Sequence, residues 1–316
     1  MYGREARLAM SASMAMKPAS VAAVIPAYNS LHLIRRALDS ILRQTRPVQE
    51  IIVVDDRSTD DTANVVAEYS GVRYIYQKNA GVSVARNTAI QAAQSEWIAF
   101  LDQDDEWLPN KIERMTAAAG ESECGVVYSD YWSDRSGSRT LARCISADRL
   151  WPSIRYRNPF VPTALMIRRD ILLESGGFRP LAHGASAEDW ELTVRLARIT
   201  NFVHIPEPLS VYYVHSGMAS GDERRFLADI LSIADTTLIM GLSGPSRWIC
   251  RQRLRCTAYT FAAIAARDNG RPAAGYVWRA LAAWPWPDHE PRKYWLLASL
   301  LKRVLDPRTR RRPAAR

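Results

Sequence analysis

The sequence lacks the long apolar segments that are typical of membrane and secreted proteins. None of its 316 residues lies in an apolar run of the roughly 18 residues that a helix needs to cross a bilayer. The first 20 residues contain scattered charges and four methionines, without the continuous apolar core of a signal peptide. The sequence therefore predicts no membrane-spanning helix and no secretory signal, and we expect residues 1–19 to form a disordered leader.

Cysteine is scarce, which limits disulfide and metal chemistry. The chain contains no C-x-x-C pair and no histidine at zinc-finger spacing from a cysteine, so we expect no structural zinc site. Free thiols are typical of a reducing compartment, and we therefore expect a cytoplasmic protein. The cysteines are Cys124, Cys144, Cys250 and Cys256.

Acidic residues are sparse toward the C-terminus. Residues 224–316 contain 18 Lys and Arg against 6 Asp and Glu, whereas residues 1–223 contain 24 against 27. The net charge of +9 therefore combines a slightly acidic body with a strongly basic C-terminal region. Such an asymmetry favours an anionic partner, either a membrane or a nucleic acid.

Short apolar runs alternate with helically spaced segments over the first 131 residues. The run at 51–54 is β-branched and apolar throughout, as expected when both faces of a strand are buried. This alternation predicts an α/β domain with a mostly parallel central sheet flanked by helices, whose ligands bind at the carboxyl ends of the strands. We expect strands at 21–25, 51–54, 72–76, 97–101 and 125–131, and helices over 31–42, 58–69, 82–93 and 109–119.

The pattern changes after residue 131. We expect an irregular excursion over 132–160, and from about residue 224 a helical region interrupted at 241–245 and 284–287. Between them, we expect strands at 164–167 and 211–214 and a helix from 188 to about 199. The predicted organisation is a domain over 20–223, with halves at about 20–131 and 132–223, followed by a basic helical extension over 224–316.

An acidic cluster, Asp102-Gln103-Asp104-Asp105, follows the strand expected at 97–101. Two like charges about 4 Å apart repel by roughly 1 kcal/mol in water and about 4 kcal/mol near a protein surface. A hard divalent cation would offset this repulsion and would complete its oxygen shell with substrate phosphates. A solvated acidic turn at the start of the next helix would explain the same residues, because Asp favours the positive end of a helix dipole.

Further polar residues lie on the same predicted rim, and each has two interpretations. Asp56 would accept a hydrogen bond from a base or ribose, or would cap the next helix. Arg86 lies in a helix start that suits a phosphate or carboxylate, or is a surface arginine. Tyr28, in the turn Pro26-Ala27-Tyr28-Asn29, would stack on a base or would pack beside the turn.

Together these motifs resemble the family-2 inverting glycosyltransferases with the GT-A fold, of the bacterial polysaccharide type, over about residues 20–215. The matching segments correspond to two nucleotide-binding turns, the Ala-Arg-Asn helix, the metal-binding Asp-x-Asp element and the acidic pair that supplies the base. Two residues depart from the family pattern: Ala89 replaces a frequent Gly, and Tyr213 replaces a frequent Arg before the late His. The segments are 24–29, 51–60, 85–87, 100–105 and 188–192.

The resemblance implies metal-dependent transfer of a sugar, with inversion, from a nucleotide-diphosphate sugar to a saccharide or lipid-linked acceptor, in the synthesis of cell-surface polysaccharide or glycolipid. It assigns the catalytic base to Asp189, with Glu188 as the second candidate; a purely structural acidic first turn is the alternative. It implies that Mg²⁺ or Mn²⁺ binds Asp104, Asp105 and His215, although His215 would also suit a structural role. The implied donor contacts are Pro26, Ala27, Tyr28, Asp56, Arg86, Asp102 and Asp104.

Other functions fit the sequence less well. A non-catalytic nucleotide-sugar binding module would bind the donor without turnover, and it remains the alternative. The acidic rim and the lack of a nucleic-acid motif argue against a nucleic-acid partner. The first turn lacks the G-x-G-x-x-G of a dinucleotide-dependent oxidoreductase. For the basic region, two interpretations stay open: peripheral contact with the anionic inner face of a membrane, or helices that cover one side of the catalytic domain.

Overall fold

The computed structural model of the chain describes residues 19–182, 187–215, 222–286 and 291–305. The leader expected at 1–19 therefore lies outside the described residues, except for its last position. A mixed sheet forms the centre of the molecule, and its strands follow the order β3-β2-β1-β4-β8-β6-β9-β5, with β7 paired to β6. No helix in the described ranges is long and apolar enough to span a bilayer.

The first half of the chain folds as the alternation predicts. β1 pairs with β2 and β4, and β2 pairs with β3, all in parallel. The strands are β1 (Val21–Ala27), β2 (Glu50–Asp55), β3 (Val72–Tyr76) and β4 (Trp97–Phe100). The helices are α2 (Ile34–Leu42), α3 (Thr62–Ala67), α4 (Val82–Ala92) and α5 (Lys111–Gly120).

The second half is less parallel than the sequence predicts. β8 joins β4 and β6 in antiparallel pairings, whereas β6 and β9 are parallel. The strands are β5 (Glu106–Trp107), β6 (Val126–Arg135), β7 (Ser138–Ala142), β8 (Leu165–Arg168) and β9 (Phe202–Val214). The helical elements are α6 (Ala147–Ser153), the 3₁₀ turn η1 (Pro162–Ala164), α7 (Arg169–Glu174) and α8 (Glu188–Leu196).

The irregular excursion expected over 132–160 is wrong for residues 132–142, which form a hairpin, and for residues 147–153, which form α6. β6 continues to Arg135 and pairs with β7 through a two-residue turn at Ser136 and Gly137. Both turn residues have positive φ, 54° and 86°, which is the geometry that joins tightly paired antiparallel strands. Strand β9 also begins nine residues before the predicted strand. The prediction began too late because Pro206 and Pro208 interrupt the apolar pattern of this strand, at the place where the β6–β9 register shifts.

Side chains on the two faces of the sheet form two buried cores. Along β1, Val21, Ala23 and Ile25 belong to one core with α2 and α5, whereas Ala22 and Val24 belong to the other with α4 and α8. Helices therefore cover both faces, as predicted for a sheet of this class. The rim at the carboxyl ends of the strands remains available for ligands.

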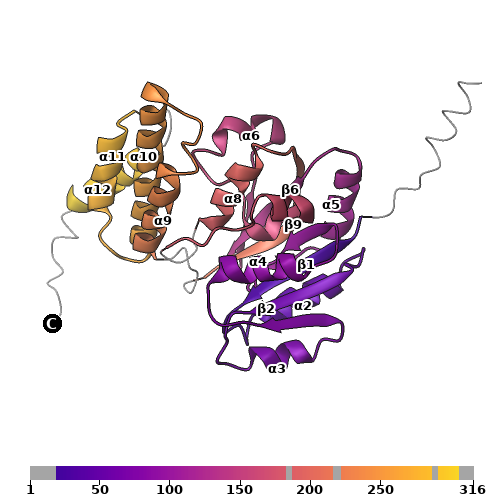
Figure 1. Cartoon of the computed structure of the whole chain (residues 1–316). Helices are drawn as coiled ribbons and strands as arrows, with labels where there is room; N and C mark the ends of the chain where they lie inside the picture. Colours follow the sequence, from indigo (N-terminus) through magenta and orange to yellow (C-terminus); the bar gives the residue numbers. More distant parts are fainter. Residues whose placement is uncertain (1–18, 183–186, 216–221, 287–290, 306–316) are drawn as a thin grey trace, which may run out of the picture.

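The basic C-terminal region is helical, with breaks near both predicted positions. Its helices are α9 (Glu223–Asp235), α10 (Gly244–Asp268), α11 (Ala274–Ala283) and α12 (Arg292–Leu305). They stand together beside α6 and α8, at the opposite end of the molecule from α3 (Figure 1). Ile233 and Leu254 belong to the same core as Trp190 of α8. The region is therefore packed against the half of the predicted domain that spans about residues 132–223.

Candidate active site

The acidic loop leaves β4 at the rim, as the sequence predicts. Asp104 lies in hydrogen-bonding contact with His215, with 2.7 Å between Asp104 Oδ2 and His215 Nε2. The two residues lie 111 positions apart, and β9 brings the histidine to the loop. Burial and the neighbouring Asp102 charge raise the pKa of Asp104. A negatively charged oxygen beside an imidazole nitrogen, in surroundings that disfavour the bare charge, is a donor set that fits a divalent cation.

Asp105 lies behind this pair and is fully buried. Its Oδ1 accepts a hydrogen bond from the Tyr213 backbone N–H at 3.0 Å, and its Oδ2 accepts one from the Thr163 hydroxyl. Burial and the Asp104 charge raise its pKa well above the usual range. The structure thus joins Asp105 to β9 and η1, so that both carboxylate oxygens already have protein partners.

Arg86 lies between the acidic loop and the acidic pair of α8. Its Nη2 donates to Asp102 and its Nη1 donates to Glu188, both at 2.6 Å. The arginine side chain is 3% exposed. The surface position that served as the alternative is therefore wrong, and the guanidinium binds two carboxylates of the protein itself.

Asp189 and Glu188 open α8, as predicted. Burial raises the pKa of Asp189 to about 6 and that of Glu188 to about 7. Asp189 Oδ2 accepts a hydrogen bond from Asn158 Nδ2 at 2.9 Å, and its Oδ1 accepts the Trp190 N–H at 2.7 Å. Glu188 pairs with Arg86 through Oε1, while Oε2 is buried without a hydrogen bond among the described residues. A carboxylate whose pKa is raised toward neutral pH is a stronger base than a free one and suits proton transfer.

The predicted donor turn lies at the end of β1. Pro26 and Ala27 are the last residues of that strand, and Tyr28 beyond them is 48% exposed. Gln103 binds the Tyr28 backbone through both amide atoms, at 2.7 Å to the N–H and 3.3 Å to the carbonyl. The second residue of the acidic loop therefore ties this loop to the turn that presents the aromatic ring.

Asp56 does not cap the helix that follows it, which was the structural role considered from the sequence. It accepts the backbone N–H groups of Ala80 at 2.9 Å and Gly81 at 2.7 Å, and the Gln77 amide at 2.8 Å. The carboxylate thus occupies the start of α4 and does not cap α3, which begins six residues later at Thr62. It is 5% exposed.

Four residues of the site were missed in the sequence. Asn158 and Thr163 are ordinary polar residues whose partners, Asp189 and Asp105, lie far away in the chain. Tyr131 of β6 and Tyr212 of β9 meet edge to face at 6.1 Å. Burial raises the pKa of both tyrosines, with further contributions from Asp105 to each. The pairing of β6 with β9, with its register shifts, brings the two rings together, and the sequence carries no signal for this pairing.

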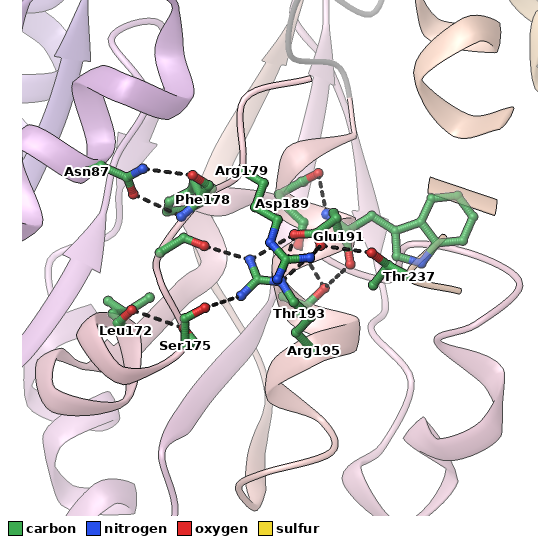
Figure 2. Close-up of polar contacts among 12 residues, drawn as sticks. Asn87, Leu172, Ser175, Phe178, Arg179, Asp189, Glu191, Thr193, Arg195 and Thr237 are labelled. Atoms are coloured by element: carbon green, nitrogen blue, oxygen red, sulfur yellow. Dashed lines mark hydrogen bonds and ion pairs between the residues drawn. The ribbon is translucent and has the colours of Figure 1, made fainter. Parts of the chain in front are cut away.

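Helix α8 is anchored at a second carboxylate, Glu191 (Figure 2). Arg195 Nε donates to both of its oxygens at 2.9 Å, and Thr237 from the C-terminal region donates to Oε1 at 2.9 Å. Arg195 also donates to the carbonyls of Ser175 and Gly177, at 2.7 and 2.6 Å. These bonds fix the helix that presents Asp189, and they connect it to the C-terminal helices.

Within the described ranges, no three His, Cys, Asp or Glu residues are grouped closely enough to hold an ion by themselves. The structure therefore does not bring Asp104, Asp105 and His215 together as the three-residue ligand set that the resemblance implies, and both oxygens of Asp105 accept hydrogen bonds from Tyr213 and Thr163. Asp104 and His215 are the residues that would supply the protein ligands.

The family model described as glycosyl transferase family 2 matches residues 22–186, more than half of the chain. The chain belongs to this family. Among curated relatives, the Escherichia coli UDP-Glc:alpha-D-GlcNAc-diphosphoundecaprenol beta-1,3-glucosyltransferase WfgD is 37% identical over 114 residues, which cover 35% of this chain and 45% of WfgD. WfaP of Escherichia coli, whose name gives the same activity, is 28% identical over 240 residues, covering 73% of this chain and 90% of WfaP. The matches to WfgD and to TuaG of Bacillus subtilis span about half the length of those relatives.

Solved structures share the fold of this chain. TarS of S. aureus in complex with UDP-GlcNAc has a TM-score of 0.64 and 19% identity, over 90% of this chain and 86% of TarS. The mannosyltransferase PcManGT from Pyrobaculum calidifontis, in complex with GDP-Man and Mn²⁺, has a TM-score of 0.58 and 19% identity, over 92% and 89%. These likenesses confirm the predicted GT-A fold.

Proposed function

We propose that the protein transfers a sugar from a nucleotide-diphosphate sugar to an acceptor hydroxyl, with inversion at the anomeric carbon. The observation that supports this most strongly is the arrangement of the rim. Asp104 and His215 lie together at the acidic loop, and Arg86 links that loop to the helix start that presents Asp189. Family membership supports the same reaction class.

In this proposal, Asp189 takes the proton of the acceptor hydroxyl as that oxygen forms a bond to the anomeric carbon. The bond between the sugar and the nucleotide diphosphate breaks in the same step, and the electron pair leaves with the diphosphate. Asn158 and the Trp190 N–H orient the Asp189 carboxylate for this transfer. Bound Mg²⁺ or Mn²⁺ would stabilise negative charge on the diphosphate as a Lewis acid, and Asp104 and His215 would hold it.

The donor would lie across the end of β1, with its base against Tyr28. Tyr28 is half exposed and its backbone is fixed by Gln103, so that stacking needs little reorganisation. The relatives WfgD and WfaP use UDP-Glc and a diphosphoundecaprenol-linked acceptor according to their names. A saccharide or lipid-linked acceptor is therefore our proposal for this chain as well.

A screen of nucleotide release tests this function. The protein is incubated with UDP-, GDP- and TDP-sugars, with and without Mn²⁺, and free nucleoside diphosphate is measured. We expect release from at least one donor, which increases with Mn²⁺ and with a matching acceptor. Binding of a donor without any release, for every donor and acceptor tried, would favour the non-catalytic binding module.

We further propose that the C-terminal helices bring the enzyme to an anionic membrane, at the cytoplasmic face where lipid-linked acceptors are presented. Four tryptophans of this region are at least 60% exposed, in a segment that carries 18 Lys and Arg against 6 Asp and Glu. Exposed aromatic rings among cationic side chains are the combination that inserts into the interface of anionic bilayers. The tryptophans are Trp248, Trp278, Trp286 and Trp295.

Flotation with phosphatidylglycerol vesicles at low salt tests the membrane contact. We expect the protein to float with these vesicles and not with phosphatidylcholine vesicles. Replacing Trp278 and Trp295 by serine should weaken flotation, whereas replacing Trp151, which is exposed on α6 of the catalytic domain, should not. Equal flotation with neutral vesicles, or none with anionic ones, would contradict this proposal.

A further inference from the structure

Two neighbouring side chains of α4 contact Phe178 and Glu188, the latter being the first residue of α8. Asn87 forms a pair of hydrogen bonds with the backbone of Phe178: its Nδ2 donates to the carbonyl at 2.7 Å, and its Oδ1 accepts the N–H at 2.9 Å (Figure 2). A side-chain amide that engages both groups of one residue imitates strand pairing. It therefore fixes both the position and the direction of the chain at Phe178.

Gly177 shows how close this contact is. A Cβ added at Gly177 would lie 2.4 Å from Asn87 Oδ1 and 3.1 Å from its Cγ, well inside normal contact. The residue also has φ of +65°, which a side chain disfavours. A side chain at residue 177 would therefore collide with the Asn87 amide, and glycine leaves room for it.

Arg86 contacts both Phe178 and Glu188. Ten residues after Phe178, Glu188 accepts a 2.6 Å hydrogen bond from Arg86 Nη1. The guanidinium also lies over the Phe178 ring, 5.1 Å from its centroid, and Phe178 packs edge to face on Phe100 at 5.3 Å. Arg86 therefore contacts Phe178 and Glu188, and Phe178 in turn packs on Phe100, the last residue of β4.

The charges around Asp189 make Arg86 important for the base as well. Glu188 precedes it on α8, Asp102 faces it from the acidic loop, Tyr131 faces it from β6, and Asn158 donates to it. Among these neighbours and Arg86, only Arg86 carries a positive charge, and it favours the ionised forms of both Glu188 and Asp189. A guanidinium binds two carboxylates at once, whereas the point charge of lysine restores the positive charge without this two-pronged geometry.

We propose that Arg86 and Asn87 are positioning residues for the catalytic base, acting as a two-residue clamp on Phe178 and Glu188. This inference deepens the proposed function, since it depends on Asp189 as the base. In this proposal, Arg86 binds the carboxylates of Asp102 and Glu188 and does not bind the donor, whereas the family resemblance implies a donor contact.

Replacement of Arg86 by glutamine tests the clamp through the titration of the acidic pair. The carboxyl pKa values of Glu188 and Asp189 are measured by NMR on ¹³C-labelled protein, a readout that needs no turnover. We expect both to rise by about one unit or more, because an opposite charge within contact distance lowers a carboxyl pKa by about that amount. The matched control is Arg169→Gln, since Arg169 donates to the backbone carbonyls of Ile90 and Gln91 at the end of α4.

Kinetics of the same variants separate the clamp from a donor contact. We expect kcat of Arg86→Gln to fall by at least tenfold and its acid limb to move to higher pH, with partial rescue in Arg86→Lys. The dissociation constant of UDP with Mn²⁺ should stay within about threefold of wild type. A tenfold weaker UDP affinity with unchanged carboxyl pKa values would overturn the proposal and return Arg86 to the diphosphate.

Asn87→Ala provides a second test that does not depend on the folding of an arginine variant. Hydrogen exchange of the Phe178 amide should accelerate at least tenfold, and kcat should fall more than the donor KM changes. Asn201→Ala, which removes one hydrogen bond to the Glu123 carbonyl, is the control. Unchanged exchange at Phe178 would overturn the clamp. Full activity of Asp189→Asn would show that Asp189 is not the base. If the pKa changes in Arg86→Gln and the exchange change in Asn87→Ala were found all the same, the clamp would stand as a structural feature alone.

Discussion

Replacement of Asp189 by asparagine removes the proposed base while it keeps the shape of the side chain. A correctly placed general base contributes about 10²–10⁴-fold to the rate, which corresponds to about 3–5 kcal/mol of transition-state stabilisation. We therefore expect kcat to fall by that factor. Because the change touches neither Tyr28 nor Asp104, the affinity for the nucleoside diphosphate should stay near the wild-type value.

The structure also predicts how the variant affects stability. The new amide would place an NH₂ group against either the Trp190 N–H or the Asn158 amide, so one hydrogen bond worth about 1 kcal/mol is lost. The loss of a buried negative charge next to Glu188 offsets this cost, since burial disfavours the ionised form of both groups. The melting temperature should therefore change by only a few degrees.

The assay is nucleotide release at saturating donor and acceptor, combined with a thermal melt and calorimetric titration of the nucleotide. Asp170→Asn is the matched control, because Asp170 pairs with Arg168 on the surface of α7. Its rate should equal that of wild type. If Asp189→Asn retained more than about a third of the wild-type kcat with an intact fold, the assignment of the base would be refuted.

Three further predictions follow from the same geometry. Since burial raises the pKa of Asp189 to about 6 and the base acts as the carboxylate, kcat should fall as the pH drops through about 6, and a limb near pH 4 would contradict this. His215→Ala should raise the Mn²⁺ concentration needed for half-maximal rate by about tenfold, and an unchanged metal requirement would remove His215 from the site. Tyr28→Ala should raise the donor KM by about five- to tenfold with a smaller change in kcat, because base stacking is worth about 1–3 kcal/mol, and an unchanged KM would place the base elsewhere.

The sequence predicts the parts of the fold that depend on local patterns. The strands β1 to β4 are short apolar runs with clear boundaries, and the helices between them have regular apolar spacing, so both were identified within a few residues. The rim motifs follow directly, because parallel strands place their carboxyl ends at one edge. The family resemblance assigns Asp104 and His215 to one metal site, and the structure brings these two side chains together.

The features that the sequence could not predict depend on contacts between distant segments. Arg86 and Glu188 lie 102 positions apart, and only the packing of α4 against the start of α8 shows that the arginine binds carboxylates of the protein. Asn158 and Thr163 have no distinctive local pattern, yet they fix Asp189 and Asp105. The reversal of direction between β4 and β8 also depends on tertiary pairing, since single strands have the same periodicity in parallel and antiparallel sheets.

The central claim is that the acidic rim binds a divalent cation that supports loss of the nucleoside diphosphate. Anomalous diffraction from crystals soaked with Mn²⁺ and the nucleoside diphosphate of the active donor tests it most directly. We predict one manganese peak within about 2.5 Å of both an Asp104 carboxylate oxygen and a diphosphate oxygen, with His215 beside it. No peak at Asp104, together with turnover that is unchanged after chelation of all metal, would contradict the account.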